Sequence, residues 1–295
     1  KKHYAAAITA FVIWGFFSIP LRALKEFTAG EILYFRILFS LLVLCVILGF
    51  KKAALAIDWL KFQNLSGPER KKVVYLTLAG SVILTLNWLT FIYVVNNVNI
   101  KTASFSYLIC PVIIAFLGYV LIGEKISRIQ WIAVGLCALS CILMGISSAL
   151  ELGYSFLTAI TYALYLISQR KNQGFDRMLM LGIQVLFSFL ILSLFVNNLV
   201  REVPQSAYFY GVIFTIAAVF TVLPLFLNLF ALNKINSATI GIFMYLNPLI
   251  NFTVAIIVFK ETADLLQIIG YSLIAVALII FNYQNFGKIR TAIGK

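Results

Sequence analysis

The chain has 295 residues, of which 62% are hydrophobic and 11% are charged, and its mean hydropathy is +1.01. A soluble domain carries roughly 45–50% apolar and about 25% charged residues, so this composition predicts a polytopic membrane protein. The single histidine, His3, cannot build His-based metal sites or catalytic triads. We therefore expect no catalytic residue, no metal site and no cofactor, and membrane metalloproteases and Ser-His hydrolases are excluded.

Ten apolar segments follow one another along the chain, each near the roughly 20 residues that a helix needs to cross a bilayer. They are predicted at residues 4–21, 32–50, 73–95, 102–122, 129–147, 152–167, 178–196, 207–232, 237–259 and 265–285. A transmembrane barrel would show shorter segments of alternating polarity, so these continuous runs favour helices. The predicted fold class is an all-α integral membrane protein.

Lysine and arginine are distributed unevenly between the connecting segments. If the N-terminus is cytoplasmic and the ten segments alternate in direction, most of the 23 Lys and Arg residues face the cytoplasm. This positive-inside bias predicts a multi-pass protein of the cell inner (plasma) membrane with both termini in the cytoplasm. The net charge of +13 then reflects topology within the lipid bilayer, and we expect no nucleic-acid partner.

The most basic connecting segment, residues 51–72, has two interpretations. Leu55, Trp59 and Phe62 follow helical spacing beside Lys52 and Lys61, which is typical of a short interfacial helix on anionic headgroups. The alternative is an ordinary solvated loop.

A shift of 137 residues superposes two long stretches of the chain without a gap. The matched residues are Asn96, Asn99, Thr102, Pro111, Glu124 and Gln130 in the first stretch and Asn233, Asn236, Thr239, Pro248, Glu261 and Gln267 in the second. We divide the chain into two repeats of five helices, residues 1–147 and 148–295. Because five is odd, the second repeat enters from the opposite side, which predicts ten transmembrane helices as two inverted five-helix repeats. Such pairs suit alternating access.

The matched prolines, Pro111 and Pro248, fall near the middle of their predicted helices. Each removes a backbone hydrogen bond, so the carbonyl groups of Tyr107 and Met244, four residues earlier, lose their usual donor. Bare backbone at that depth is tolerated only inside protein or along a water-filled cavity. We therefore predict helix breaks with a gating role that line a cavity, and the alternative is a packed kink.

Amides and aromatic side chains in the spans are candidates for lining that cavity. A buried amide must be paired or face a polar cavity, and Tyr and Trp suit an amphipathic one. The predicted cavity residues of these types are Trp14, Asn87, Trp88, Asn96, Tyr107, Tyr165, Tyr245 and Asn247. For each of them, packing between helices is the alternative.

Arg36 is the charged side chain that lies clearly inside a predicted span. It could snorkel to the outer interface, or it could bind a substrate carboxylate or phosphate through its fixed bidentate donors. All ten acidic residues fall in loops or at helix ends. A pump that exchanges protons for lipophilic cations would need a carboxylate at depth, so this mechanism is disfavoured.

Small residues recur every four positions in the fifth span, at Ala133, Cys137, Cys141 and Gly145. Such a stripe permits close helix approach. It predicts packing inside the chain, with a homodimer as the alternative.

Several segments resemble the drug/metabolite transporter superfamily with EamA-type repeats, and more narrowly its RarD-type group. They are FVIWGFFSIP, FRILFS, NWLTFIYVVNN, ASFSYLICP, IGEKISRIQWIAV, YALYLISQRK, TVLPLFLNLFAL and GIFMYLNPL. The resemblance covers nearly the whole chain and implies ten helices in two inverted repeats around a central cavity. It places Trp14, Arg36, Asn87, Trp88, Asn96, Tyr107, Pro111, Tyr165, Tyr245 and Pro248 on family motifs. The chain departs from the RarD pattern at Cys110, where Asn is usual, and at Asn247, where Gly is usual.

We therefore expect a secondary-active or facilitative transporter, with export favoured over uptake, for small polar or amphipathic metabolites. Arg36 would hold a carboxylate or phosphate of this small-molecule substrate. The amides Asn87, Asn96 and Asn247 would hydrogen-bond it, and Trp88, Tyr107 and Tyr245 would pack on its apolar part. The alternatives are a membrane-embedded enzyme or scaffold acting on lipid-linked substrates, and a passive channel. The spans offer an enzyme few groups beyond Ser, Thr and Tyr.

Overall fold

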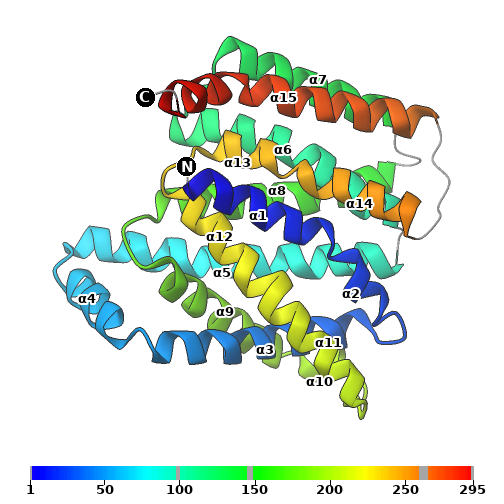
Figure 1. Cartoon of the computed structure of the whole chain (residues 1–295). Helices are drawn as coiled ribbons and strands as arrows, with labels where there is room; N and C mark the ends of the chain where they lie inside the picture. Colours follow the sequence, from blue (N-terminus) through cyan, green and yellow to red (C-terminus); the bar gives the residue numbers. More distant parts are fainter. Residues whose placement is uncertain (1, 98–99, 145–148, 259–264, 294–295) are drawn as a thin grey trace.

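The computed structural model describes residues 2–97, 100–144, 149–258 and 265–293, and all regular secondary structure within these ranges is helical (Figure 1). In the first half of the chain the helices are α1 (Lys2–Gly15), α2 (Ser18–Arg22), α3 (Ala29–Gly49), α4 (Lys52–Gln63), α5 (Gly67–Asn97), α6 (Ile100–Ile122) and α7 (Arg128–Met144). In the second half they are α8 (Ala149–Lys171), α9 (Arg177–Ser193), α10 (Val196–Leu199), α11 (Ala207–Ala217), the π-helical turn η1 (Ala218–Val222), α12 (Leu223–Leu232), α13 (Ser237–Phe243), α14 (Leu246–Ile257) and α15 (Leu265–Ile293).

Four helical stretches are long and apolar enough to cross a membrane, judged by length and composition. They are Lys2–Arg22, Ala29–Gly49, Gly67–Val94 and Ala207–Leu232. Shorter apolar helices cover Ser106–Ile122, Arg128–Leu143, Arg177–Ser193, Ser237–Ile250 and Ile268–Phe281. The prediction of an all-α membrane protein is confirmed, whereas the count of ten transmembrane helices stays a prediction.

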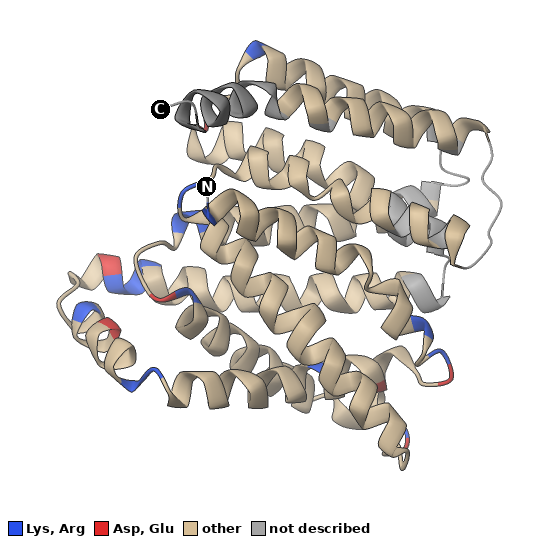
Figure 2. Cartoon of the chain, viewed as in Figure 1, with Lys and Arg blue, Asp and Glu red and all other residues tan. Residues whose placement is uncertain are grey.

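The long helices lie side by side in one bundle (Figure 1). α7 and α15 pack against each other at one edge, and α3, α9 and α11 lie toward the opposite edge. Lys and Arg gather at the end of the bundle where α1 begins and α8 ends, which we call the basic end (Figure 2). This separation of charge is what the positive-inside pattern predicts, and the assignment of the basic end to the cytoplasm stays a prediction.

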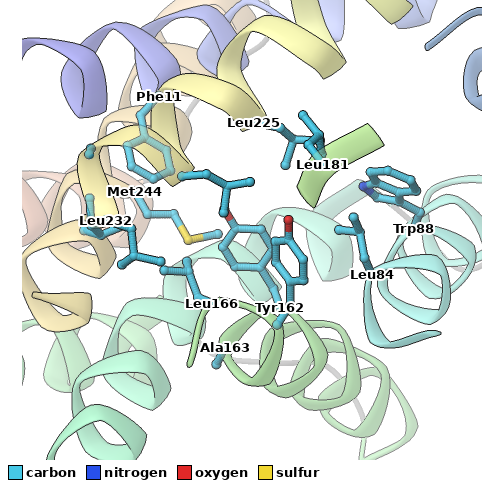
Figure 3. Close-up of a cluster of buried hydrophobic side chains, with 14 of the residues drawn as sticks. Phe11, Leu84, Trp88, Tyr162, Ala163, Leu166, Leu181, Leu225, Leu232 and Met244 are labelled. Carbon is cyan, nitrogen blue, oxygen red and sulfur yellow. The ribbon is translucent and has the colours of Figure 1, made fainter. Parts of the chain in front are cut away.

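The largest apolar core joins both halves of the chain (Figure 3). Phe11 of α1, Trp88 of α5, Tyr162 of α8 and Leu225 of α12 meet in it, and all four are buried. Helices that are far apart in the sequence are therefore held around one centre, and the polar groups discussed below lie within this packing.

The small-residue stripe on α7 is used inside the chain. Ala133, Cys137 and Cys141 are buried in a second apolar core together with Ile274 of α15. Short side chains allow the two helices to approach closely. Gly145 lies outside the described residues, and the homodimer stays a prediction.

The basic segment after α3 forms helix α4, which lies across the basic end of the bundle (Figure 1). The Lys51 ammonium pairs with Asp176 at 2.6 Å, and the backbone N–H of Asp176 donates to Asp58 at 2.6 Å. Burial opposes ionisation of Asp176. Hydrogen bonds from Lys51 and from the first N–H groups of α9 outweigh burial and hold the pKa of this carboxyl below its ordinary value of 3.8. These contacts tie α4 to the connection between α8 and α9.

Candidate functional site

A narrow hollow lies inside the bundle, between α5, α6, α8 and the gap that separates α13 from α14. Its lining residues are Asn87, Ser106, Tyr107, Cys110, Thr158, Ala159, Tyr162 and Met244. The space between these side chains is too narrow for a water molecule. Asn87 and Tyr107 are the predicted cavity residues that line it. The hollow is therefore closed to a substrate in this conformation.

Polar groups around the hollow are paired with one another. Asn87 Nδ2 donates to the Thr158 carbonyl at 2.8 Å and to Thr161 Oγ1 at 3.1 Å, which fastens α5 to α8. Cys110 Sγ donates to the carbonyl of Ala159 at 3.4 Å. Each of these bonds joins different helices, so opening the hollow requires them to be exchanged for bonds to a ligand or to water.

Sequence reasoning did not place Cys110 and Met244 among the site residues. The internal repeat carried the signal for both. A shift of 137 residues takes Cys110 to Asn247 and Tyr107 to Met244. A position selected in one repeat was therefore a reason to select its counterpart in the other.

The matched prolines have different surroundings. α6 runs without interruption through Pro111, so the predicted break is not found there. Before Pro248 the chain does break, because α13 ends at Phe243 and α14 begins at Leu246. The prediction of a bare carbonyl at Met244 is wrong, since the N–H of Asn247 donates to it at 3.1 Å in a tighter turn.

The Arg36 side chain points into the bundle. It is 6% exposed, and its Nε donates to Thr221 Oγ1 of η1 at 2.8 Å. The guanidinium carbon lies 5.2 Å from the ring centres of both Phe17 and Trp88. Cation–π contacts of this kind stabilise a desolvated cation without neutralising it. Among the described residues no carboxylate forms an ion pair with Arg36.

Pro224, which was not singled out in the sequence, explains why Trp14 bonds to the backbone of η1. Pro224, just after η1, has no N–H to donate to the carbonyl of Phe220, four residues earlier. Trp14 Nε1 donates to that carbonyl at 3.0 Å and so replaces the missing donor. A proline inside the segment 207–232 was the available signal, because the argument made for Pro111 and Pro248 applies equally there.

The other predicted site residues lie outside the lining of the hollow. Tyr165 is fully buried between α8 and α9, where its hydroxyl donates to Gln184 Oε1 at 3.4 Å. Tyr245 is fully buried in the second apolar core, and its hydroxyl donates to the Leu108 carbonyl at 2.8 Å. Asn247 is buried at the start of α14. The side chain of Asn96 lies outside the described residues.

A carboxylate closes the bundle at its basic end. Gly123, at φ 64°, ends α6 in the left-handed region that glycine favours. Glu124 then accepts from the N–H of Ser237 at 2.8 Å and of Ala238 at 3.2 Å, the first two residues of α13. It also pairs with Arg170 of α8 at 3.5 Å. A negative charge at a helix N-terminus is favourable, so Glu124 holds α6, α8 and α13 together.

The sequence profile of the EamA-like transporter family matches residues 1–146 and again residues 150–283. The chain belongs to this family. Over 297 residues it is 26% identical to the uncharacterized transporter YojE of Bacillus subtilis (strain 168), with 97% of this chain and 95% of that protein covered. It is 25% identical to protein RarD of Escherichia coli (strain K12), with 93% and 92% covered.

Two further comparisons agree with this assignment. Protein RarD of Streptomyces exfoliatus is 29% identical over 286 residues, which are 96% of this chain and 88% of that one. A crystal structure of a protein with 10% sequence identity superposes with a TM-score of 0.74 and covers 94% of this chain and 95% of its own. The chain therefore shares the fold of that structure. As an EamA-like protein with relatives named as transporters, it is a multi-pass membrane transporter of the drug/metabolite type.

Proposed function

We propose that this EamA-like transporter carries small amphipathic metabolites that bear a carboxylate or a phosphate. Transport would be secondary-active or facilitative, by alternating access of the repeats 1–147 and 148–295. The protein would work in the cell inner membrane with the basic end and both termini in the cytoplasm, and export would be its direction.

The observation that carries the proposal is the environment of Arg36. A buried charge without a counter-ion is unfavourable in a protein interior, and replacing it with an apolar residue would remove that free-energy penalty. The charge is held by the Thr221 hydroxyl and by the rings of Phe17 and Trp88, none of which supplies a negative charge. A substrate anion would supply it, and the guanidinium would offer two parallel donors.

The neighbouring side chains suit the apolar part of such a substrate. Trp88 follows Asn87 on α5, and Asn87 and Tyr107 line the hollow. An aromatic surface beside a cation and an amide favours a flat or aliphatic body with an anionic group at one end.

Binding of anions and of their neutral analogues tests the proposal. The detergent-purified protein is heated with benzoate or benzamide, with succinate or succinamide, and with glycerol phosphate or glycerol. A bound ligand stabilises the folded protein in proportion to its concentration relative to Kd. We expect at least one anion to raise the melting temperature in a saturable way, and its neutral analogue to leave that temperature unchanged.

Variants tie that effect to the site. Arg36→Ala should abolish the anion-dependent shift, and Arg36→Lys should keep part of it, because an ammonium retains the charge but not the planar fork. Lys52→Ala, at an exposed position on α4, is the matched control and should behave as the wild type. If Arg36→Ala binds every anion as the wild type does, the anion proposal is wrong. For an anion that binds the wild-type protein, counterflow of this anion in proteoliposomes distinguishes a carrier from a channel.

A further inference from the structure

One face of α8 is polar along most of its length although it is buried. The residues of this polar face are Thr158, Thr161, Tyr162, Tyr165, Ser168 and Gln169, with Asn172 continuing it just after α8 ends at Lys171, and each is at most 9% exposed. They recur at intervals of three and four residues, which puts them on one side of a helix. α8 has 23 residues, but it is absent from the apolar spans among the described residues. A helix in the centre of a membrane bundle therefore keeps a polar face about 20 Å long, at 1.5 Å per residue.

The polar face connects the hollow with the basic end. Thr158 and Tyr162 line the hollow. Further along, Tyr165 contacts Gln184 of α9, and Asn172 Nδ2 donates to Thr77 of α5 at 2.9 Å. Near the end of α8, Arg177 Nη1 donates to the carbonyl groups of Gln169 at 3.3 Å and Asn172 at 3.2 Å. The face thus leads from the hollow toward the basic end of the bundle.

Polar atoms without partners concentrate along this face. Within the described part of the chain, seven buried side-chain nitrogen or oxygen atoms have no hydrogen-bond partner. Five of them line the polar face, namely Gln169 Oε1, Asn172 Oδ1, Arg177 Nη2, Gln184 Nε2 and Asn228 Oδ1. Leaving such an atom unpaired costs about 1–3 kcal/mol, and folded proteins contain few of them. A cluster of this kind indicates a place where water or a ligand supplies the missing bonds.

A glycine lets the amides of the cluster pack directly against α5. A Cβ atom on Gly80 of α5 would lie 2.7 Å from Gln169 Nε2, 3.0 Å from Gln184 Nε2 and 3.3 Å from Ser168 Oγ. No side chain longer than hydrogen fits there without displacing these groups. The two amides therefore occupy the space that a side chain at position 80 would take.

The position of Gln184 is related to that of Arg36 by an internal similarity. A shift of 148 residues superposes RILFSLL, which begins at Arg36, on QVLFSFL, which begins at Gln184. The same local bond follows each residue, because Ser40 Oγ donates to the Arg36 carbonyl at 2.7 Å and Ser188 Oγ donates to the Gln184 carbonyl at 2.9 Å. The same shift takes Phe17, which contacts Arg36, to Tyr165, which contacts Gln184. One repeat thus has a cation at this position and the other has a neutral amide.

We propose that the polar face of α8 is the route between the hollow and the basic end, and that Gln169 and Gln184 opposite Gly80 form a second binding station on it for uncharged hydrogen-bonding groups. The inference rests on the proposed transport function. It narrows the substrate class to anions that also carry a hydroxyl or amide group, since Gln169 and Gln184 offer amide donors and acceptors. In the conformation described here the route is closed.

Cysteine labelling tests the route without knowledge of the substrate. In a variant whose four native cysteines are replaced, Ser168→Cys places a thiol on the polar face. Ala163→Cys places one on the opposite side of the same helix, at a site that is also buried, with 0% exposure against 9% for Ser168. Permeabilised membranes are treated with one of two thiol reagents, an anionic sulfonatoethyl methanethiosulfonate or a cationic trimethylammonium methanethiosulfonate. We expect Cys at position 168 to react, Cys at position 163 to stay protected, and the anionic reagent to react about tenfold faster because Arg177 lies beside the polar face.

Equal labelling at the two positions, or labelling at neither, would overturn the route. This outcome is independent of anion binding at Arg36, so failure of the route and failure of the anion proposal can be told apart. The cysteine-free background is accepted as folded only if its melting temperature and its elution profile match those of the wild type.

Gly80→Ala tests the second station. The added methyl group must displace the two amides, so we expect transport of a hydroxylated anion such as malate to fall at least about tenfold relative to succinate. Gly135→Ala on α7, where the added methyl group meets open space, is the control. Gln184→Leu should give the same selectivity change as Gly80→Ala. If both variants reduce the transport of malate and of succinate by the same factor, the second binding station is wrong. That result would not contradict the anion site at Arg36.

Discussion

The third and fourth helices of the two repeats differ in continuity. In the first repeat α5 and α6 are unbroken, whereas their counterparts contain the π-helical turn η1 and the gap between α13 and α14. Proline alone does not decide this, because Pro111 and Pro248 occupy matched positions. In the second repeat each freed carbonyl has a substitute donor, Trp14 for Phe220 and the N–H of Asn247 for Met244. An interrupted helix is stable in a membrane when its backbone is satisfied in this way.

α1 supports both interruptions. Trp14 reaches η1, and the adjacent Gly15 lies so close to α14 that a Cβ on it would be 2.6 Å from Ile250 Cβ. The helices of the first repeat are thus continuous, whereas those of the second repeat are interrupted, and α1 contacts both interrupted helices. The following predictions test that difference.

The largest effect is expected from the proline exchanges. Pro248→Ala restores an N–H and favours a continuous α13–α14, since proline inside a helix costs about 3 kcal/mol. A bias of that size shifts a two-state equilibrium by about 100-fold. We expect counterflow in proteoliposomes to fall at least about tenfold, with little change for Pro111→Ala. Equal losses for the two variants would refute the difference between the repeats.

Gly15→Ala should be next in size. The new methyl group would overlap Ile250, and overpacking of this kind costs about 1–3 kcal/mol. We expect a lower melting temperature and reduced counterflow. Gly211→Ala on α11 meets open space and should be neutral or slightly stabilising. A Gly15→Ala protein as stable as the wild type would mean that α1 does not fix α14.

Removing single donors should have smaller effects. Trp14→Phe leaves the Phe220 carbonyl without a partner, and Tyr245→Phe removes the bond to Leu108, each at about 1 kcal/mol. Thermal unfolding in detergent measures both. Tyr75→Phe, at a position that is 71% exposed, is the control and should not change the melting temperature. If Trp14→Phe leaves the melting temperature unchanged, as the control does, the bond from Trp14 does not stabilise the interruption at η1.

The smallest effect concerns the contact of α4 with the second repeat. Because the pKa of Asp176 is lowered in the folded protein, its contribution to stability is present above the ordinary Asp value of 3.8. That contribution is lost as the pH falls below this value, through the lower pKa of the folded protein. We expect Asp176→Asn to be slightly less stable than the wild type at pH 7 and indistinguishable from it in strong acid. A difference that persists unchanged in strong acid would contradict the ion pair with Lys51.

Much of the fold followed from the sequence because hydropathy and helix length are local properties. The apolar segments, the basic end and the likeness between the halves all depend on composition or spacing. The break before Pro248 was predictable, but the continuity of α6 was not, since it depends on packing around Pro111. The contacts of Arg36 were likewise hidden, because Trp88 and Thr221 reach it from helices far away in sequence. The interruption near Pro224 was also predictable, by the argument used for Pro111 and Pro248.

The hydrogen bond from Tyr245 to Leu108 joins positions exactly one repeat shift apart, because both numbers differ by 137. Two identical inverted repeats would give a carrier whose inward-open and outward-open states have equal free energy, each being the image of the other. Leucine has no hydroxyl to return the bond, so the image of this contact does not exist. An unreciprocated bond of about 1 kcal/mol favours one resting state about fivefold. In a carrier of the proposed alternating-access type, the Tyr245 hydroxyl would therefore stabilise one resting state over the other.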